Sequence, residues 1–184
     1  STAMGYQTEA SGDYSTAMGY YTTASGIRST AMGSGTTANG GTSVAMGSNT
    51  SASGNGTTAM GFGTNASGFY STTMGIYTIA SDLLSLVMGQ YNLAGSTVTE
   101  DSIGEEGTSA NTFSLDNIAF VIGNGTNSDS RSDALVVKFN GDATLAGTLN
   151  INSDARLKSN IISLGSTLSK LLQIDGKSYT MKKD

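Results

Sequence analysis

The sequence predicts an all-β protein whose first half is a parallel β-roll built from coils of fourteen residues. Three observations predict this fold: a methionine-glycine pair with a strict period, alanine and threonine columns on that period, and glycines at two fixed places in each repeat. Self-similarity at a fixed period is typical of a repeat architecture. Fourteen residues are too few for a helix–turn–helix unit, but they suit two short strands joined by two tight turns.

The repeat extends over residues 1–98, and its consensus reads S-T-A-M-G-x-x-T-x-A-S-G-x-x. The methionine column consists of Met4, Met18, Met32, Met46, Met60, Met74 and Met88. Alanine recurs from Ala10 to Ala94 and threonine from Thr8 to Thr78. A disordered Gly/Ser/Thr linker is the alternative, and the strict columns count against it because disorder imposes no register.

The alternation of side chains along a strand predicts which residues point inward. Ser15, Ala17 and Gly19 share one face, whereas Thr16 and Met18 share the other. The small residues predict a narrow interior that admits only Ala, Ser, Thr and Gly. The methionine column is too large for this interior, so we expect it on the outside of the coil.

The methionine column implies a need for partners. Seven coils that stack about 4.8 Å apart would make a rod about 33 Å long, with the seven methionines aligned along it as an apolar ladder. An apolar stripe of this length does not normally face water. We therefore expect several copies to press their methionine faces together, and closed rings of three satisfy such contacts. Thr columns are also typical of ice-binding faces, but each column here stands alone beside Ala.

The repeat over residues 1–98 resembles the S-V-A-I-G…A-S-G repeat of the YadA-like head of trimeric autotransporter adhesins. The resemblance implies a left-handed parallel β-roll trimer with its apolar S-x-A-x-G residues at the threefold axis. This chain departs from the family by placing Met where Val or Ile is usual. Asp82 replaces the glycine found at Gly68 one repeat earlier, and apolar residues follow it. We expect a degenerate last coil there, at the end of the roll.

Residues 99–152 predict a small β-rich collar. Strand composition marks Ile118–Gly123, Ala134–Phe139 and Ala143–Ile151, and the Asn-Gly pair at 140–141 predicts a hairpin turn. The acidic stretch before these strands contains Glu100, Asp101, Glu105 and Glu106. Their spacing does not fit an EF-hand loop, so a solvated acidic loop is favoured over a calcium site.

Composition and charge exclude several classes of function. The chain has no cysteine and no histidine, which excludes disulfides, thiolate zinc sites and a Ser-His-Asp triad. We expect no cofactor and no metal. The net charge of −5 argues against a nucleic-acid partner. No apolar run is long enough to span a bilayer, and because the chain opens within a repeat we expect an excerpt of a longer protein.

Charge also divides the chain into segments. Residues 1–98 hold only four charged side chains, residues 99–152 carry a net charge of −6, and residues 153–184 carry +3. We therefore expect a β-roll, a collar and a distinct C-terminal segment with these boundaries. In the last segment, leucines at helical spacing followed by an Asp-Gly pair predict a short helix, a turn and a strand.

The C-terminal segment opens with S-D-A-R-L-K, in which Ser153, Asp154, Arg156 and Lys158 match an S-D-x-R-x-K motif. It resembles the start of the self-cleaving intramolecular chaperone of endosialidase-type phage tailspikes and tail fibres. The resemblance implies that this segment trimerises the upstream fibre and is then released. By the same resemblance, Ser153 is the nucleophile, Lys158 is its general base, and the bond cut is Asn152–Ser153.

The chemistry of that cleavage is reasonable from the residues alone. A serine hydroxyl needs a base, and in the absence of histidine the candidates are lysine and the carboxylates. A lysine can serve if its surroundings lower its pKa. Only 32 residues follow Asn152, so we expect the N-terminal part of a longer chaperone.

Two classes of function follow from these observations. The first is a homotrimeric structural and adhesive fibre segment outside the cell, on a virion tail or a bacterial surface, with a host-surface or matrix receptor. The chaperone motif favours the tail-fibre version. The second is the non-catalytic stalk of a glycan-depolymerising tailspike whose enzyme domain lies outside this excerpt. Glycosidases need paired carboxylates, and the roll offers only Glu9, Asp13 and Asp82.

Overall fold

The structure is a computed structural model that describes residues 1–95 and 113–149. The described strands lie in one compact unit, Ser1–Thr148. They are β1 (Thr2–Tyr6), β2 (Thr16–Tyr20), β3 (Thr23–Ala24), β4 (Thr30–Ser34), β5 (Thr37–Ala38), β6 (Val44–Ser48), β7 (Ser51–Ala52), β8 (Thr58–Phe62), β9 (Asn65–Ala66), β10 (Thr72–Ile76), β11 (Ile79–Ala80), β12 (Leu86–Gln90), β13 (Ile118–Asn124), β14 (Asp133–Lys138) and β15 (Ala143–Leu145). The helix expected after residue 153 lies outside the described residues.

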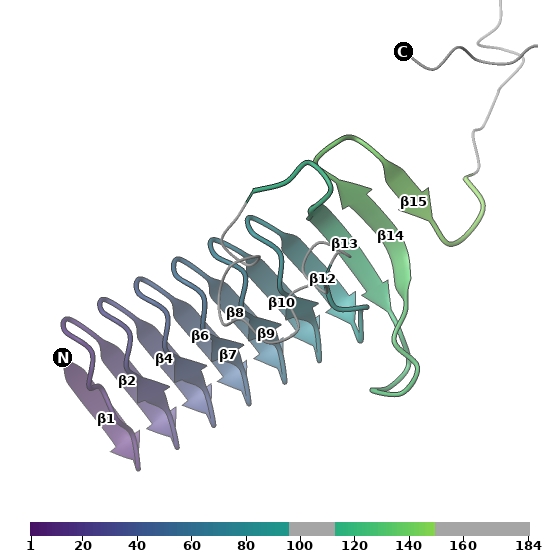
Figure 1. The fold of residues 1–184 in the computed structure, drawn as a ribbon. Helices are drawn as coiled ribbons and strands as arrows, with labels where there is room; N and C mark the ends of the chain where they lie inside the picture. The colour runs from purple at the N-terminus through teal and green to yellow at the C-terminus, as the bar shows by residue number, and fades with distance from the viewer. Residues whose placement is uncertain (96–112, 150–184) are drawn as a thin grey trace, which may run out of the picture. The chain divides into compact units, whose positions relative to one another are not determined.

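The N-terminal region is a parallel β-roll, as the period predicts. Its long strands, β1, β2, β4, β6, β8, β10 and β12, pair in sequence order, and its short strands β3 to β11 form a second sheet. Each pairing joins residues fourteen positions apart, for example Met18 with Met32 and Ala24 with Ala38. Figure 1 shows the coils stacked in a row from the N-terminus. The fold class expected from the sequence is confirmed.

Glycine after each methionine is required by the stacking of the coils. The φ angle of Gly19 is 127°, and a Cβ atom added there would lie 2.0 Å from the carbonyl oxygen of Gly33. No side chain fits at that distance, so the column admits only glycine. The two corners of each coil also use positive φ angles, and here the chain often places larger residues, such as Tyr21 and Arg28.

The interior of the roll is lined by small side chains. The alanines of these two columns are buried from Ala17 to Ala80, and Ser15 and Thr22 lie beside them. Six buried hydroxyl groups have no hydrogen-bond partner among the described residues: those of Thr22, Ser29, Thr36, Ser43, Thr50 and Thr64. In one coil Thr73 replaces the alanine, and its hydroxyl lies 2.5 Å from that of Thr78. The predicted narrow interior is confirmed, with Ser15 and Ala17 buried, whereas Gly19, predicted on the same face, is exposed.

The long sheet continues beyond the fourteen-residue repeat. β13 pairs in parallel with β12, so that Val121 lies beside Val87 and Ile122 beside Met88. β14 and β15 then add antiparallel strands to the same sheet. The collar therefore extends the roll's own sheet. The domain boundary at residue 98 stays a prediction.

The predicted collar strands are found with small shifts, except that the last one is shorter than expected. It ends at Leu145 and does not reach Ile151. The chain bends at Ala146 and Gly147, and the Ala146 N–H donates to the carbonyl of Ala134. The hairpin turn predicted before this strand is confirmed, with a φ angle of 92° at Gly141.

A group of side chains that we call the cap ends the two-sheet part of the roll: Asp82, Asn92, Arg131 and Asp133. The short sheet ends at β11, and the Asn92 amide takes the place of a further strand. Its Oδ1 accepts from the Ile79 N–H at 2.7 Å, and its Nδ2 donates to the Ile79 carbonyl at 2.9 Å. The open edge of β11 is thereby satisfied by one side chain.

Asp82 occupies a column that is otherwise glycine. At Gly68 a Cβ atom would lie 2.2 Å from the Asp82 carbonyl oxygen of the following coil. At Asp82 the carboxylate Oδ2 instead accepts from the Ile118 N–H at 2.7 Å. The last coil keeps the register of its long strand, since β12 pairs with β10, but it has no short strand after β11. Its Asp side chain makes the connection to β13.

The loop between β13 and β14 completes the cap. The Arg131 guanidinium donates to the Tyr77 carbonyl at 2.9 Å and to the Asn92 carbonyl at 3.1 Å, and it lies over the Tyr91 ring. The Asp133 carboxylate accepts from the Leu93 N–H at 3.0 Å. Burial raises the pKa of Asp133 above its usual value, and the bond from Leu93 opposes this rise.

Candidate self-association face and C-terminal motif

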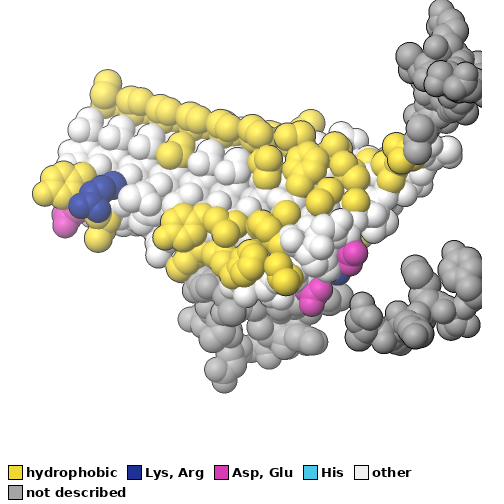
Figure 2. All heavy atoms as spheres, turned by 90° about the horizontal axis from the view of Figure 1, so that it is seen from above, with side chains coloured by type: hydrophobic (Ala, Val, Ile, Leu, Met, Phe, Trp, Pro, Cys, Tyr) yellow, Lys and Arg dark blue, Asp and Glu magenta, His cyan; other side chains and the backbone are white. Residues whose placement is uncertain are grey.

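The outer face of the long sheet presents the methionine column. Met4 pairs with Met18, and the same pairing repeats up to Met74 with Met88. Met4 is 59% exposed, and the later methionines are half-buried because each lies between its neighbours in the column. Figure 2 shows a continuous line of hydrophobic side chains along the roll. The methionines lie outside the coil, as expected.

Two further columns flank the methionines on the same face. Thr16 and its equivalents precede them, with Val44 and Leu86 as apolar members, and Tyr20 and Phe62 belong to the column that follows. From β1 to β12 the outward positions carry no charged side chain. The face is therefore wider than the methionine column named from the sequence. Strand alternation applied two residues further along would have found the second flanking column.

Aromatic side chains gather at the corner that follows the methionine-glycine pair in the coils at both ends of the roll. Tyr6 and Tyr20 stack with ring centroids 5.4 Å apart, and Tyr21 packs edge-on against Tyr20 at 4.4 Å. A second group, at the other end of the roll, pairs Tyr77 with Tyr91 at 5.1 Å. These tyrosines were not singled out from the sequence, because the repeat has no fixed residue at these positions.

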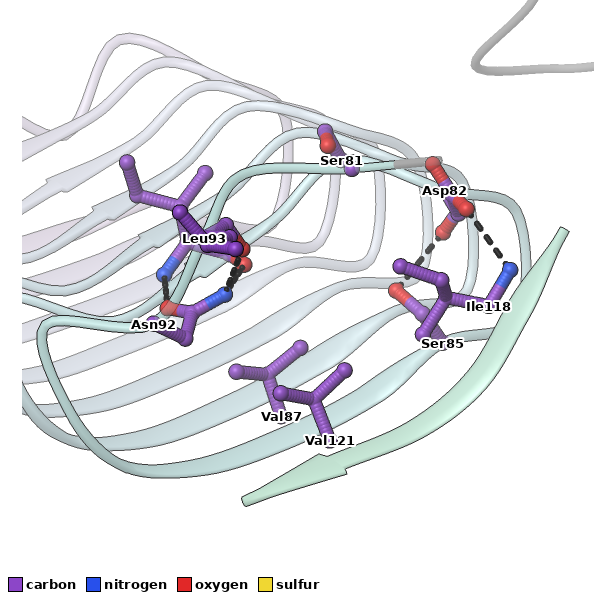
Figure 3. A pocket seen from close by; sticks show the side chains of 10 residues that line it. Ser81, Asp82, Ser85, Val87, Asn92, Leu93, Ile118 and Val121 are labelled. Carbon is purple, nitrogen blue, oxygen red and sulfur yellow. Dashed lines mark hydrogen bonds between the residues drawn. The ribbon is translucent and has the colours of Figure 1, made fainter. Parts of the chain in front are cut away.

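A small pocket lies at the C-terminal end of the roll's interior, and Figure 3 shows its lining. Val87 and Val121 line one side of it. Asn92 and Asp82 also line it, and both are engaged in the cap's hydrogen bonds. The pocket is the end of the narrow interior, where apolar valines replace the alanines of earlier coils.

The residues expected to carry self-cleavage are not placed by the structure. Asn152, Ser153 and Lys158 lie outside the described residues, and so does the acidic stretch weighed as a calcium site. Their roles stay predictions. No helix among the described residues is long and apolar enough to cross a bilayer.

Comparison with protein families gives two matches. The YadA head domain repeat matches residues 1–22, 24–50 and 52–80. The chaperone of endosialidase matches residues 153–184. The chain joins YadA head repeats to an endosialidase chaperone. Both resemblances seen in the sequence are thereby confirmed. No curated protein matches the chain.

The YadA head repeats account for the roll, and the chaperone match begins at Ser153, the first residue of the S-D-x-R-x-K motif. Families of both kinds are usually homotrimeric, and together they support a trimeric adhesin or a tail-fibre-like segment. Both also suggest a place on an extracellular surface or a phage tail fibre.

Proposed function

We propose that this chain is a segment of a homotrimeric attachment fibre in which three copies meet through the outer face of the long sheet. The observation that carries the proposal is the uncharged, in-register methionine column over seven strands. A soluble monomer rarely exposes a continuous apolar patch of more than a few hundred Å². Placing this face at a threefold axis removes it from water in every copy at once.

Methionine suits a long and narrow contact of this kind. Its flexible thioether adapts to irregular gaps, so three identical columns can interdigitate without a fixed pattern of knobs and holes. Burial of a methionine side chain is worth about 1.5–3 kcal/mol. Because the methionines after Met4 are already half-buried in one copy, each gains only part of this energy, and the seven rungs contribute together against the cost of association.

Light scattering of the full chain tests the trimer. We expect a particle three times the 18.7 kDa of the single chain, or its counterpart shortened by cleavage. Met60→Lys should weaken the trimer strongly, because it buries three ammonium groups near the axis. Thr37→Lys is the matched control, since Thr37 lies in the short sheet on the other side of the coil. A monomeric wild-type chain would overturn the proposal.

We also propose that the chaperone segment is released by self-cleavage after assembly. The Ser153 hydroxyl attacks the carbonyl carbon of Asn152 while the Lys158 amine accepts the hydroxyl proton. The peptide C–N bond breaks, the Ser153 nitrogen takes a proton, and an ester joins the two residues. Water then hydrolyses the ester, leaving the Asn152 carboxylate and a free Ser153 amine. The match of the endosialidase chaperone to residues 153–184 supports this assignment.

Mass spectrometry of the purified full chain tests the cleavage. We expect two fragments that meet between Asn152 and Ser153, and a single intact chain for Ser153→Ala. Lys158→Met should slow the reaction, because no base then accepts the hydroxyl proton. Arg156→Met is the matched control for loss of positive charge in the same motif. An intact wild-type chain would show that this copy does not cleave itself, and the trimer proposal would stand.

A further inference from the structure

The apolar outer face does not end with the methionine column. β13 is the next strand of the same sheet, and its Phe120 lies beside Leu86, and Ile122 beside Met88. Partners in neighbouring strands project on the same face. The column from Met4 to Met88 is therefore continued by Ile122, although residues 96–112 intervene in the sequence.

The hairpin β14–β15 widens this face. Leu135 lies opposite Ile122, and Val137 lies opposite Phe120. On the next strand Leu145 lies opposite Leu135. Directly opposed residues of antiparallel strands project on one side. We call these five residues the collar patch: Phe120, Ile122, Leu135, Val137 and Leu145.

The other side of the collar sheet faces the core of the chain. Val121 is buried in the end of the roll, and Val136 packs against the same core cluster. Thr144 is opposite Val136, on that inward side. The collar patch therefore lies on the face of the sheet that points away from the core cluster of its own chain. Its residues are half-buried or, at Leu145, 44% exposed.

We infer that the collar patch binds a second copy of this chain and is the part of the trimer contact that locks the three copies in register. The inference rests on the proposed trimer. A second copy is the occupant because the patch continues the methionine column without a change of strand register. Three copies brought together through that column would bring their collar patches to the same height along the axis.

The composition of the patch explains why it locks the register. The methionine column repeats every coil, so two copies shifted by one coil would still present methionine to methionine. The collar patch occurs once, and it consists of branched and aromatic side chains with few rotamers. A shift by one coil would place Phe120 and Leu135 against different partners. The segment that matches the chaperone begins eight residues after Leu145, at Ser153.

A charge placed on the patch tests the inference in the full chain. Leu145→Glu should raise the concentration at which half of the trimer dissociates by at least about tenfold, as measured by light scattering across a dilution series. Thr144→Glu adds the same charge one residue away on the opposite face and should leave that concentration unchanged. Leu145→Met keeps the side chain apolar and should also leave the trimer intact. Circular dichroism should show the same β content in all three variants.

The outcomes separate the inference from the function on which it rests. A wild-type chain that is monomeric would overturn both. A wild-type trimer that Leu145→Glu leaves unchanged would overturn the collar contact alone, and so would equal loss with Thr144→Glu. Weakening by Leu145→Glu only, with both controls trimeric, supports the collar patch as a contact between copies.

Discussion

The repeating coils and the cap both provide hydrogen-bond partners for strand backbone, the coils with neighbouring strands and the cap with side chains. In the roll, the strands of each coil are hydrogen-bonded to those of the neighbouring coils, which have nearly the same sequence. The same steric constraint therefore selects glycine or alanine at the equivalent position of each coil. In the cap, single side chains replace a strand: Asn92 covers the edge of β11, and Asp82 accepts from Ile118. Six interior hydroxyls of the roll are unpartnered among the described residues, whereas the cap's polar groups have named partners.

The difference shows where each region tolerates change. A glycine position in the roll is constrained by the backbone of the next coil, which leaves no room for a side chain. A cap position is constrained by the hydrogen bonds of one particular side chain. Substitutions that separate these two kinds of constraint test the comparison directly.

The largest effect is expected from Gly47→Ala in the roll. A Cβ atom there would lie 2.1 Å from the Gly61 carbonyl oxygen, at a φ angle of 122°. Clash and backbone strain together should cost at least about 3 kcal/mol, and thermal unfolding followed by circular dichroism measures it. Gly141→Ala in the collar hairpin is the control, since its φ angle is 92° but nothing lies within 4 Å of the added carbon. It should cost only about 1 kcal/mol. Equal losses would contradict stacking as the reason for the glycine column.

The next largest effect is expected from Asn92→Ala in the cap. The variant leaves the N–H and the carbonyl of Ile79 without their partner, at a cost of about 2–3 kcal/mol. Hydrogen exchange at the Ile79 amide should become faster together with the drop in thermal stability. Asn65→Ala is the roll's control, because the Asn65 Oδ1 has no partner among the described residues. If both variants lose equal stability, Asn92 is not acting as a substitute strand.

A smaller change in stability is expected when interior hydroxyls are removed, and its sign should depend on whether the hydroxyl has a hydrogen-bond partner. Thr50→Val should be neutral or stabilise the fold by up to about 1 kcal/mol, because the Thr50 hydroxyl is fully buried without a partner among the described residues. Thr57→Val should destabilise it by about 1 kcal/mol, since that hydroxyl donates to the Gly54 carbonyl at 2.7 Å. Chemical denaturation of the two variants side by side measures the difference. A loss for both would mean that the Thr50 hydroxyl is satisfied in solution.

The roll could be predicted from the sequence because each coil packs against coils of nearly the same sequence. Ala17 and Met18 were assigned to opposite faces by alternation alone, and the stacked structure keeps that assignment at every rung. The outward methionine column followed for the same reason. The flanking Tyr20 column was missed, since that position is variable and carries no repeat signal.

The cap could not be predicted in the same way. Asn92 follows Thr78 by one period, and nothing in the local sequence shows that its amide bonds to β11. β13 was expected in a separate collar because the period is broken by residues 96–112. One signal was available: F-V-I-G at 120–123 repeats the pattern of L-V-M-G at 86–89, and these segments pair in that register. The cleavage residues were assigned by resemblance, which the family match supports at the level of the segment.

The smallest effect concerns charge in the cap, at Asp133. Burial raises the pKa of its carboxyl, so the folded state favours the neutral form. Below the unfolded pKa of about 3.9, both states are protonated and Asp133 costs nothing; as pH rises through the folded pKa, its ionisation progressively destabilises the fold. Asp133→Asn keeps an oxygen that can accept from the Leu93 N–H. The variant should therefore unfold at a slightly higher temperature than the wild type at pH 7, and the gap should close toward pH 3. A gap that is constant with pH would assign the effect to packing, and would leave the Leu93 bond as the only role of this side chain.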